Sequence, residues 1–237
     1  MFKEKIKITS NDVDKFLNLK VSSLFKFFQQ VSTDHAEVIH VGTADTIDKG
    51  MCWVMLRMEV KIYDYPKINE EVIVSTHPGT VDRFIFPRFY QLYSKKGKLL
   101  ASGSSTWAVI NMSTRRIVPR PFENGIMKGE SLKDDIPLPE KIVYSELEKI
   151  ETRLIRNSDI DLNGHLNNTK YIDFILDTKE PGYFDKKVLT RIVVNYEKEL
   201  KEGESVELFV NEKENIVQGK RDGKECFTAQ LEFKERK

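Results

Sequence analysis

The sequence predicts an α+β protein, and three features agree on this. Most apolar residues alternate with polar ones over short runs, which is typical of antiparallel strands that bury one face. Two runs carry apolar residues at helical spacing, one early in each half of the chain. The order of strand, helix and several strands occurs twice, so the sequence also predicts a tandem repeat.

The first half opens with a strand pattern and an amphipathic helix. Residues 3–9 alternate between polar and apolar and predict the strand. The apolar face of the helix is formed by Val21, Leu24, Phe25, Phe28 and Val31. Alternating runs then predict strands at residues 53–63, 71–77, 83–93 and 99–111. A hairpin turn, Lys-Lys-Gly-Lys at residues 95–98, precedes the last of these strands.

The second half repeats this order. Residues 146–156 predict a strand, and residues 166–178 predict a helix. Further strands are expected at residues 188–199, 205–211, 215–220 and 226–233. The hairpin turn Arg-Asp-Gly-Lys, residues 221–224, again precedes the last strand. Short sequence matches also indicate a duplication, namely residues 10–14 with 157–161 and residues 69–72 with 203–206.

A proline-rich segment separates the two halves. Residues 118–142 show little periodicity and hold four of the eight prolines, which are Pro119, Pro121, Pro137 and Pro139. We therefore expect an N-terminal repeat at residues 1–118, a linker at 119–142 and a C-terminal repeat at 143–237. A helix wrapped by a curved antiparallel sheet, twice in tandem, matches the architecture called a double hotdog, although periodicity alone supports only the α+β class.

Composition excludes several classes of protein. The 237 residues are 40% hydrophobic and 32% charged, which fits one large globular domain or two small ones. Lys and Arg number 38 against 37 Asp and Glu, so the charge favours neither a nucleic-acid binder nor a membrane-surface protein. Cys52 and Cys226 lack metal-site spacing and predict buried free thiols. The charged N-terminus resembles no secretory signal, and no window predicts a membrane span, so we expect a cytoplasmic protein.

Asp161, Asn163 and His165 stand at alternating positions just before the second predicted helix. In an extended segment such side chains project from one face, and Gly164 permits a sharp turn between the last two. The first amides of the helix have no partner inside it, so polar side chains and free N–H groups would gather there. This set can attack a carbonyl and stabilise an oxyanion. Spacing alone favours a simpler interpretation, an ordinary helix N-terminal turn with a surface histidine.

Two longer segments carry a resemblance to a known family. Residues 158–172 read Ser-Asp-Ile-Asp-Leu-Asn-Gly-His-Leu-Asn-Asn-Thr-Lys-Tyr-Ile, and residues 105–116 read Ser-Thr-Trp-Ala-Val-Ile-Asn-Met-Ser-Thr-Arg-Arg. Together with Trp53-Val54 and Tyr65-Pro66, they resemble the acyl-acyl-carrier-protein (acyl-ACP) thioesterases over nearly the whole chain. The resemblance implies a tandem hotdog fold. It also implies an enzyme that hydrolyses fatty acyl-ACP to free fatty acid and ACP, which ends fatty acid synthesis.

The resemblance implies four catalytic residues, because Asp161, Asn163, His165 and Glu199 occupy the family's positions. Plant members commonly carry a cysteine directly after the glutamate, whereas this chain has Leu200. A thiol nucleophile at that place is therefore excluded, which favours direct attack by water. Without the resemblance, Glu199 would be interpreted as a solvated charge at a strand end.

The chemistry of a thioester requires little beyond these groups and implies no metal or cofactor. Its carbonyl is a good electrophile, and a thiolate, whose parent thiol has a pKa of about 8.5, leaves without strong protonation. We assign His165 and Glu199 to positioning and deprotonating the water, with their division of labour open. Asn163 would hold the water or the carbonyl, and Asp161 would orient the loop. Backbone amides at residues 166–168 are the expected oxyanion donors.

The first repeat lacks an equivalent acid–base pair. When the repeats are aligned on the short sequence matches, Phe16 corresponds to Asn163 and Asn18 corresponds to His165. Tyr65 and Pro66 correspond to Glu199 and Leu200. We therefore expect the first repeat to supply the acyl pocket through the apolar face of its helix. Ordinary core packing explains most of that face equally well.

Three functions from different classes remain open. The first is hydrolysis of acyl-ACP, the second is hydrolysis of acyl-coenzyme A on the same scaffold, and the third is a non-catalytic acyl-binding module. An acidic carrier protein would require a basic surface, for which the candidates are Arg115, Arg116, Arg120 and Lys128. Both a monomer and a homodimer are compatible with a tandem repeat.

Overall fold

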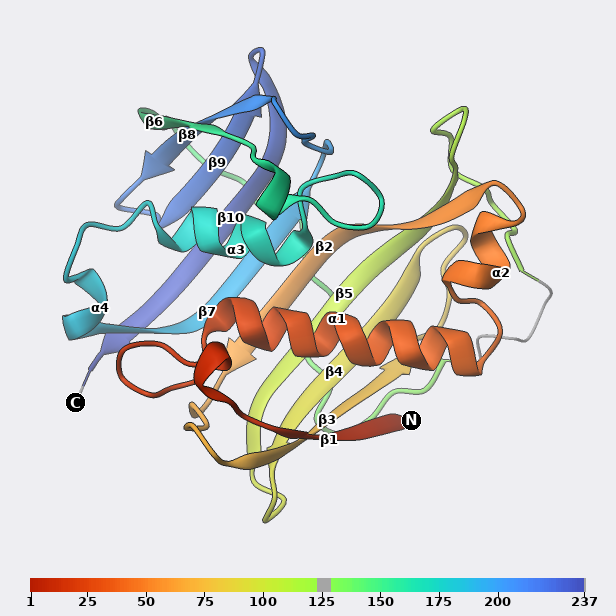
Figure 1. Ribbon diagram of the computed structural model, residues 1–237, viewed down its shortest axis with the longest axis horizontal. Helices are drawn as coiled ribbons and strands as arrows, with labels where there is room; N and C mark the ends of the chain where they lie inside the picture. The colour runs from red at the N-terminus through yellow and green to blue at the C-terminus, as the bar shows by residue number, and fades with distance from the viewer. Residues whose placement is uncertain (123–128, 237) are drawn as a thin grey trace. The chain divides into compact units, whose positions relative to one another are not determined.

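The computed structural model describes residues 1–122 and 129–236 and divides into two compact units, Met1–Pro139 and Glu140–Lys237. Each unit contains an antiparallel sheet with a helix lying across it (Figure 1). The boundary between the units falls inside the range expected for the linker, 119–142, but residues 130–139 belong to the first unit. Lys128, a candidate for the basic surface, lies outside the described residues.

In the first unit the strands lie side by side in the order β1-β3-β4-β5-β2. In chain order its elements are β1 (Phe2–Lys7), a 3₁₀ turn (Ser10–Asp12), α1 (Val21–Val38), α2 (Thr43–Ile47), β2 (Met51–Ile62), β3 (Glu71–Pro78), β4 (Phe86–Ser94) and β5 (Leu99–Asn111). Strand β4 begins at Phe86 rather than at residue 83, because Asp82 and Ile85 close a tight turn and Arg83 takes a positive φ of 56°. The short helix α2 was not predicted.

Helix α1 packs on one face of the first sheet, as its apolar stripe predicts. Leu24, Phe28 and Val31 are buried, and the ring of Phe28 stacks on that of Tyr90 from β4 at 5.0 Å. Gly103 of β5 lies directly under this ring, since a Cβ there would stand 3.0 Å from Phe28. The absence of a side chain at residue 103 therefore lets the helix approach the sheet closely.

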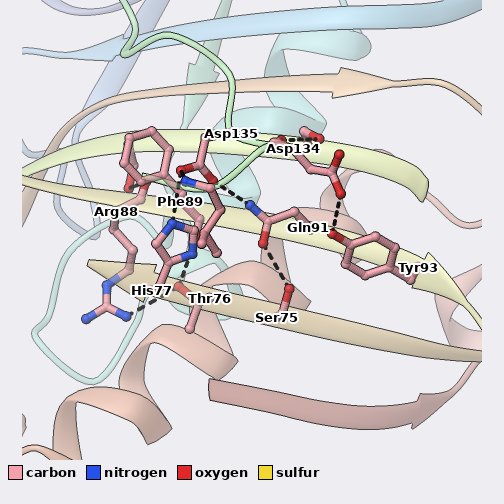
Figure 2. Close-up of polar contacts among 12 residues, drawn as sticks. Ser75, Thr76, His77, Arg88, Phe89, Gln91, Tyr93, Asp134 and Asp135 are labelled. Atoms are coloured by element: carbon pink, nitrogen blue, oxygen red, sulfur yellow. Dashed lines mark hydrogen bonds and ion pairs between the residues drawn. The ribbon is translucent and has the colours of Figure 1, made fainter. Parts of the chain in front are cut away.

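The opposite face of this sheet is covered by residues 130–139. Side chains alternate along β4, so Gln91 and Tyr93 point away from the face that holds Tyr90. Gln91 donates to Asp135 at 2.9 Å, and Tyr93 donates to Asp134 at 2.8 Å (Figure 2). His77 of β3 adds a contact to Asp135, with 3.1 Å between Nε2 and Oδ2. These contacts explain why the second half of the expected linker belongs to the first unit.

In the second unit the strands lie in the order β7-β10-β9-β8-β6. In chain order its elements are β6 (Glu148–Leu154), a 3₁₀ turn (Asn157–Asp159), α3 (Asn168–Leu176), α4 (Tyr183–Lys186), β7 (Lys187–Tyr196), β8 (Ser205–Asn211), β9 (Ile216–Arg221) and β10 (Lys224–Glu235). Helix α3 packs on the sheet through Tyr171, whose ring meets the rings of Tyr196 and Phe227 edge-on, at 5.3 and 5.2 Å between centroids. Helix α4 was not predicted.

The two units repeat the same main-chain contacts ahead of their helices. In the first unit, Ile8 N–H donates to Glu70 O and Leu19 N–H donates to Pro66 O. In the second unit, the corresponding bonds run from Ile155 N–H to Glu204 O and from Leu166 N–H to Leu200 O. Residues before and within each helix correspond at an offset of 147, and residues after the long strand correspond at an offset of 134. The structure therefore gives the residue-by-residue correspondence between the repeats that short sequence matches only indicated.

Candidate active site

The loop before α3 is organised by Asp161. Its Oδ1 accepts hydrogen bonds from the backbone N–H of Asn163 at 2.8 Å and of His165 at 3.3 Å, and its own N–H donates to the carbonyl of His165 at 2.8 Å. Gly164 has a φ of 77°, which suits glycine and closes the turn. The carboxylate therefore fixes the turn that carries His165.

The first repeat contains the same loop without the same chemistry. Asp14 Oδ1 accepts from the backbone N–H of Phe16 at 2.8 Å and of Asn18 at 3.0 Å. Leu17 takes a positive φ of 62° where the second repeat has Gly164. Since Asp14 makes these bonds in a repeat with no histidine at the corresponding place, the bonds are a requirement of the loop itself.

His165 and Glu199 face each other in the second repeat. The distance between His165 Nε2 and Glu199 Oε2 is 3.0 Å, and the two side chains are 21% and 34% exposed. A main-chain contact explains this proximity, because Leu166 N–H donates to Leu200 O at 2.7 Å. His165 and Glu199 directly precede these two leucines, so the bond brings them together. An imidazole and a carboxylate in contact, still reachable from solvent, can together activate a water molecule.

Asn163 lies at the exposed tip of the loop. Its backbone N–H is bound by Asp161, and no hydrogen bond joins its side-chain amide to another residue within the described ranges. The amide is therefore available to a ligand.

The start of α3 offers fewer free donors than the sequence predicts. Leu166 N–H is bound by Leu200 O, and Asn167 N–H donates to Asp159 O at 2.9 Å. The expectation that the amides of residues 166–168 bind an oxyanion is therefore wrong for the first two. Asn167 caps the helix, because its Oδ1 accepts from Thr169 N–H at 2.9 Å. Of the three, the amide of Asn168, the first residue of the helix, is left as a donor.

Leu200 directly follows Glu199 and is fully buried. Because this residue is a leucine, the position offers no thiol. Neither cysteine forms a disulfide; Cys226 is buried in β10 as expected, whereas Cys52 is only half-buried in β2. Of the basic candidates, Arg115, Arg116 and Arg120 are exposed. Across the described ranges, no helix is both long and apolar enough to cross a membrane.

Comparison with known proteins identifies the family. The N-terminal domain of acyl-ACP thioesterases matches residues 1–123, and their C-terminal domain matches residues 144–234. The chain belongs to the acyl-ACP thioesterase family. It is 25% identical over 214 residues to a chloroplastic palmitoyl-acyl carrier protein thioesterase of Arabidopsis thaliana, which covers 84% of this chain and 52% of that protein. It thus spans about half the length of this relative.

A second relative and two solved structures extend the comparison. Oleoyl-acyl carrier protein thioesterase 2 of Arabidopsis thaliana is 26% identical, covering 94% of this chain and 66% of that protein. An acyl-ACP thioesterase from Bacteroides thetaiotaomicron superposes with a TM-score of 0.90, 24% identity and coverage of 98% and 97% of the two chains. The 12:0-ACP thioesterase from Umbellularia californica superposes with a TM-score of 0.81, 20% identity and coverage of 99% and 97%. These likenesses confirm the α+β class and the tandem hotdog fold.

Proposed function

We propose that this member of the family hydrolyses fatty acyl-ACP to free fatty acid and ACP and so ends fatty acid synthesis. The observation that carries the proposal is the contact, at 3.0 Å, between His165 of the motif loop and Glu199 of the connection that follows β7. The corresponding residues of the first repeat, Asn18 and Tyr65, cannot form an acid–base pair. A chain that served only to bind acyl groups would have no use for such a pair in one repeat.

The contact favours His165 as the group that takes the proton from water. Glu199 accepts a hydrogen bond from Nε2, so Nδ1 is the ring nitrogen left with a lone pair, and the carboxylate stabilises the imidazolium that forms. Water attacks the thioester carbonyl, its proton passes to His165, and a tetrahedral oxyanion forms. The oxyanion then collapses, the C–S bond breaks, and the thiolate recovers the proton. Asn168 N–H and the Asn163 amide are the donors that would hold the oxyanion.

The repeats have different roles in this proposal. The second unit, which follows a connection within residues 119–142, carries Asp161, Asn163, His165 and Glu199. In this proposal the first unit supplies the acyl pocket through the apolar face of α1, which includes Leu24, Phe25, Phe28 and Val31. The acyl-phosphopantetheine arm of ACP and the fatty acyl chain are the proposed partners, and the cytoplasm is the proposed location.

A panel of thioesters tests the proposal. Purified protein is incubated with acyl-ACP and acyl-coenzyme A substrates of increasing chain length, and the released thiol is measured, with a reaction that contains no enzyme as the blank. We expect the largest kcat/KM on acyl-ACP. A clear preference for acyl-coenzyme A would replace the proposed substrate, and no release above the blank from any thioester would mean that the chain is not a thioesterase.

A further inference from the structure

Arg88 of β4 carries a buried positive charge next to helix α1. It is 6% exposed, and its Nη1 donates to His35 Nδ1 at 3.0 Å and to Thr76 Oγ1 at 3.3 Å (Figure 2). Burial and the charge of Arg88 lower the pKa of His35 to about 4, so both acceptors are neutral at pH 7. Within the described residues, no Asp or Glu forms an ion pair with this guanidinium. In this part of the chain the charge therefore has hydrogen-bond partners but no counter-charge.

Arg153 of β6 shows the more usual arrangement. Its guanidinium contacts Glu151 at 2.9 Å and Asp177 at 3.0 Å, although its side chain is partly exposed and still hydrated. An arginine stays protonated in a protein, and its charge costs far more free energy in the interior than at the surface unless an anion compensates. Burial accordingly lowers the pKa of Arg88. Among the described residues, the more buried of the two arginines is thus the one without an anion.

One edge of the Arg88 guanidinium is left for a ligand. The contacts to His35 and Thr76 use Nη1, which leaves the N–H groups of Nε and Nη2. Neither nitrogen is among the described side-chain atoms that are both fully buried and unpaired, so both keep some contact with solvent. The N–H groups of Nε and Nη2 point in parallel and match the two oxygens of a carboxylate. The structure therefore presents half of a bidentate ion pair.

The buried face of α1 changes from apolar to polar toward Arg88. Leu24, Phe28 and Val31 belong to the apolar part, and His35, about one turn beyond Val31, is the residue that contacts the arginine. In the proposed function the acyl chain lies along this face. A chain that follows the apolar part would bring its end to the guanidinium, and a carboxylate at that end would supply the counter-charge.

We propose that the Nε–Nη2 edge of Arg88 binds the carboxylate of an aliphatic chain. The placement of that chain along α1 rests on the proposed function, whereas the capacity of Arg88 to bind a carboxylate does not. Two sources share this chemistry. The carboxylate belongs either to the far end of an ω-carboxyacyl substrate or to a fatty acid that the enzyme has released.

Calorimetric titration without any thioester tests the carboxylate site. We expect the wild type to bind octanoate more tightly than octanamide, which has the same chain but no charge, and Arg88→Met to bind octanoate roughly 10-fold more weakly or worse. Arg153→Met is the matched control and should keep the wild-type affinity, because Arg153 already holds two carboxylates. Equal octanoate affinities in the wild type and Arg88→Met would overturn the inference. Should Arg88→Met fail to fold, equal binding of octanoate and octanamide by the wild type would overturn it as well.

Two kinetic measurements distinguish the sources of the carboxylate. If it belongs to the substrate, the wild type has a higher kcat/KM on ω-carboxyacyl-ACP than on acyl-ACP of the same length, and Arg88→Met loses this preference. If it belongs to a released fatty acid, octanoate inhibits the wild type and Arg88→Met relieves the inhibition. Absence of both effects would overturn the assignment to an acyl chain. Absence of turnover on every thioester would instead contradict the proposed function, and the calorimetric result would still decide whether Arg88 binds a carboxylate.

Discussion

Arg88 donates a hydrogen bond to Nδ1 of His35 at 3.0 Å in the interior of the first unit. Both side chains are buried, and Arg88 also reaches Thr76 at 3.3 Å (Figure 2). Burial and the positive charge of Arg88 lower the pKa of His35 to about 4. The imidazole is therefore neutral in the folded protein at pH 7 and serves as the acceptor for the guanidinium.

This contact makes stability depend on pH. The pKa of histidine in an unfolded chain is about 6.5, so the unfolded state binds a proton more readily than the folded state does. The contribution of neutral His35 to the free energy of unfolding is therefore fully present above about pH 6.5, and it is lost as the pH falls toward about 4. Between pH 7 and pH 5 we expect the free energy of unfolding to fall by ~2 kcal/mol more in the wild type than in His35→Gln, which keeps an acceptor but cannot titrate. Urea unfolding at both pH values measures this, and equal losses would contradict it.

His165→Ala and Glu199→Ala should each reduce kcat/KM for thioester hydrolysis by roughly 100-fold or more. Both side chains are partly exposed, so the far-ultraviolet circular dichroism and the melting temperature should stay near those of the wild type. Asn18→Ala, at the place in the first repeat that corresponds to His165, is the control and should retain activity. Near wild-type turnover in either site variant would remove that residue from the mechanism.

Asp161→Asn should keep most of the activity, whereas Asp161→Ala should lose it. The side-chain oxygen of asparagine can accept the same two backbone hydrogen bonds that hold the loop, and alanine cannot. Steady-state kinetics of both variants measure this difference. Asp14→Ala provides the comparison, because it loosens the corresponding loop of the first repeat and should lower the melting temperature with little change in kcat. Equal inactivity of both Asp161 variants would show that the negative charge itself is required.

Leu200→Cys should not raise turnover, because water rather than a thiol attacks the thioester. Leu200 is fully buried, and a cysteine there would have its pKa raised by burial rather than lowered. Steady-state kinetics of the variant, and mass spectrometry of the wild type quenched during turnover, provide the measurement. A covalent acyl group on the wild-type enzyme would refute attack by water.

The sequence predicts the strands and the long helices, because alternating and helical patterns persist over many residues. Helices α2 and α4 were missed since five and four residues are too short to show a helical period. The motif at residues 158–172 indicates Asp161, Asn163 and His165 through the family resemblance. The contact of His165 with Glu199 could not be derived from spacing, because it depends on a main-chain bond between Leu166 and Leu200, which are far apart in the chain.

The sequence also could not predict which backbone amides at the start of α3 already have hydrogen-bond partners. Leu166 and Asn167 look like free helix N-terminal donors until the acceptors, Leu200 and Asp159, are placed beside them.

The exposed arginines of the first unit allow the acyl donor to be tested. Carrier protein is acidic, so a basic surface on this enzyme should steer it, and Arg115, Arg116 and Arg120 are exposed. Reversing one of these charges to glutamate should lower kcat/KM for acyl-ACP much more than for an uncharged pantetheine thioester with the same acyl chain. The loss should shrink as salt reduces the Debye length below about 10 Å.

Lys96→Glu is the matched control for this comparison, because Lys96 is exposed in a hairpin of the same unit and lies outside the proposed docking surface. It should leave kcat/KM for both substrates near the wild-type values. Coenzyme A also carries phosphates, so the uncharged pantetheine thioester is the substrate that isolates the carrier protein. Equal losses on the two substrates in an arginine variant would show that the arginine is structural. No loss on either would mean that the carrier docks elsewhere or is not the acyl donor.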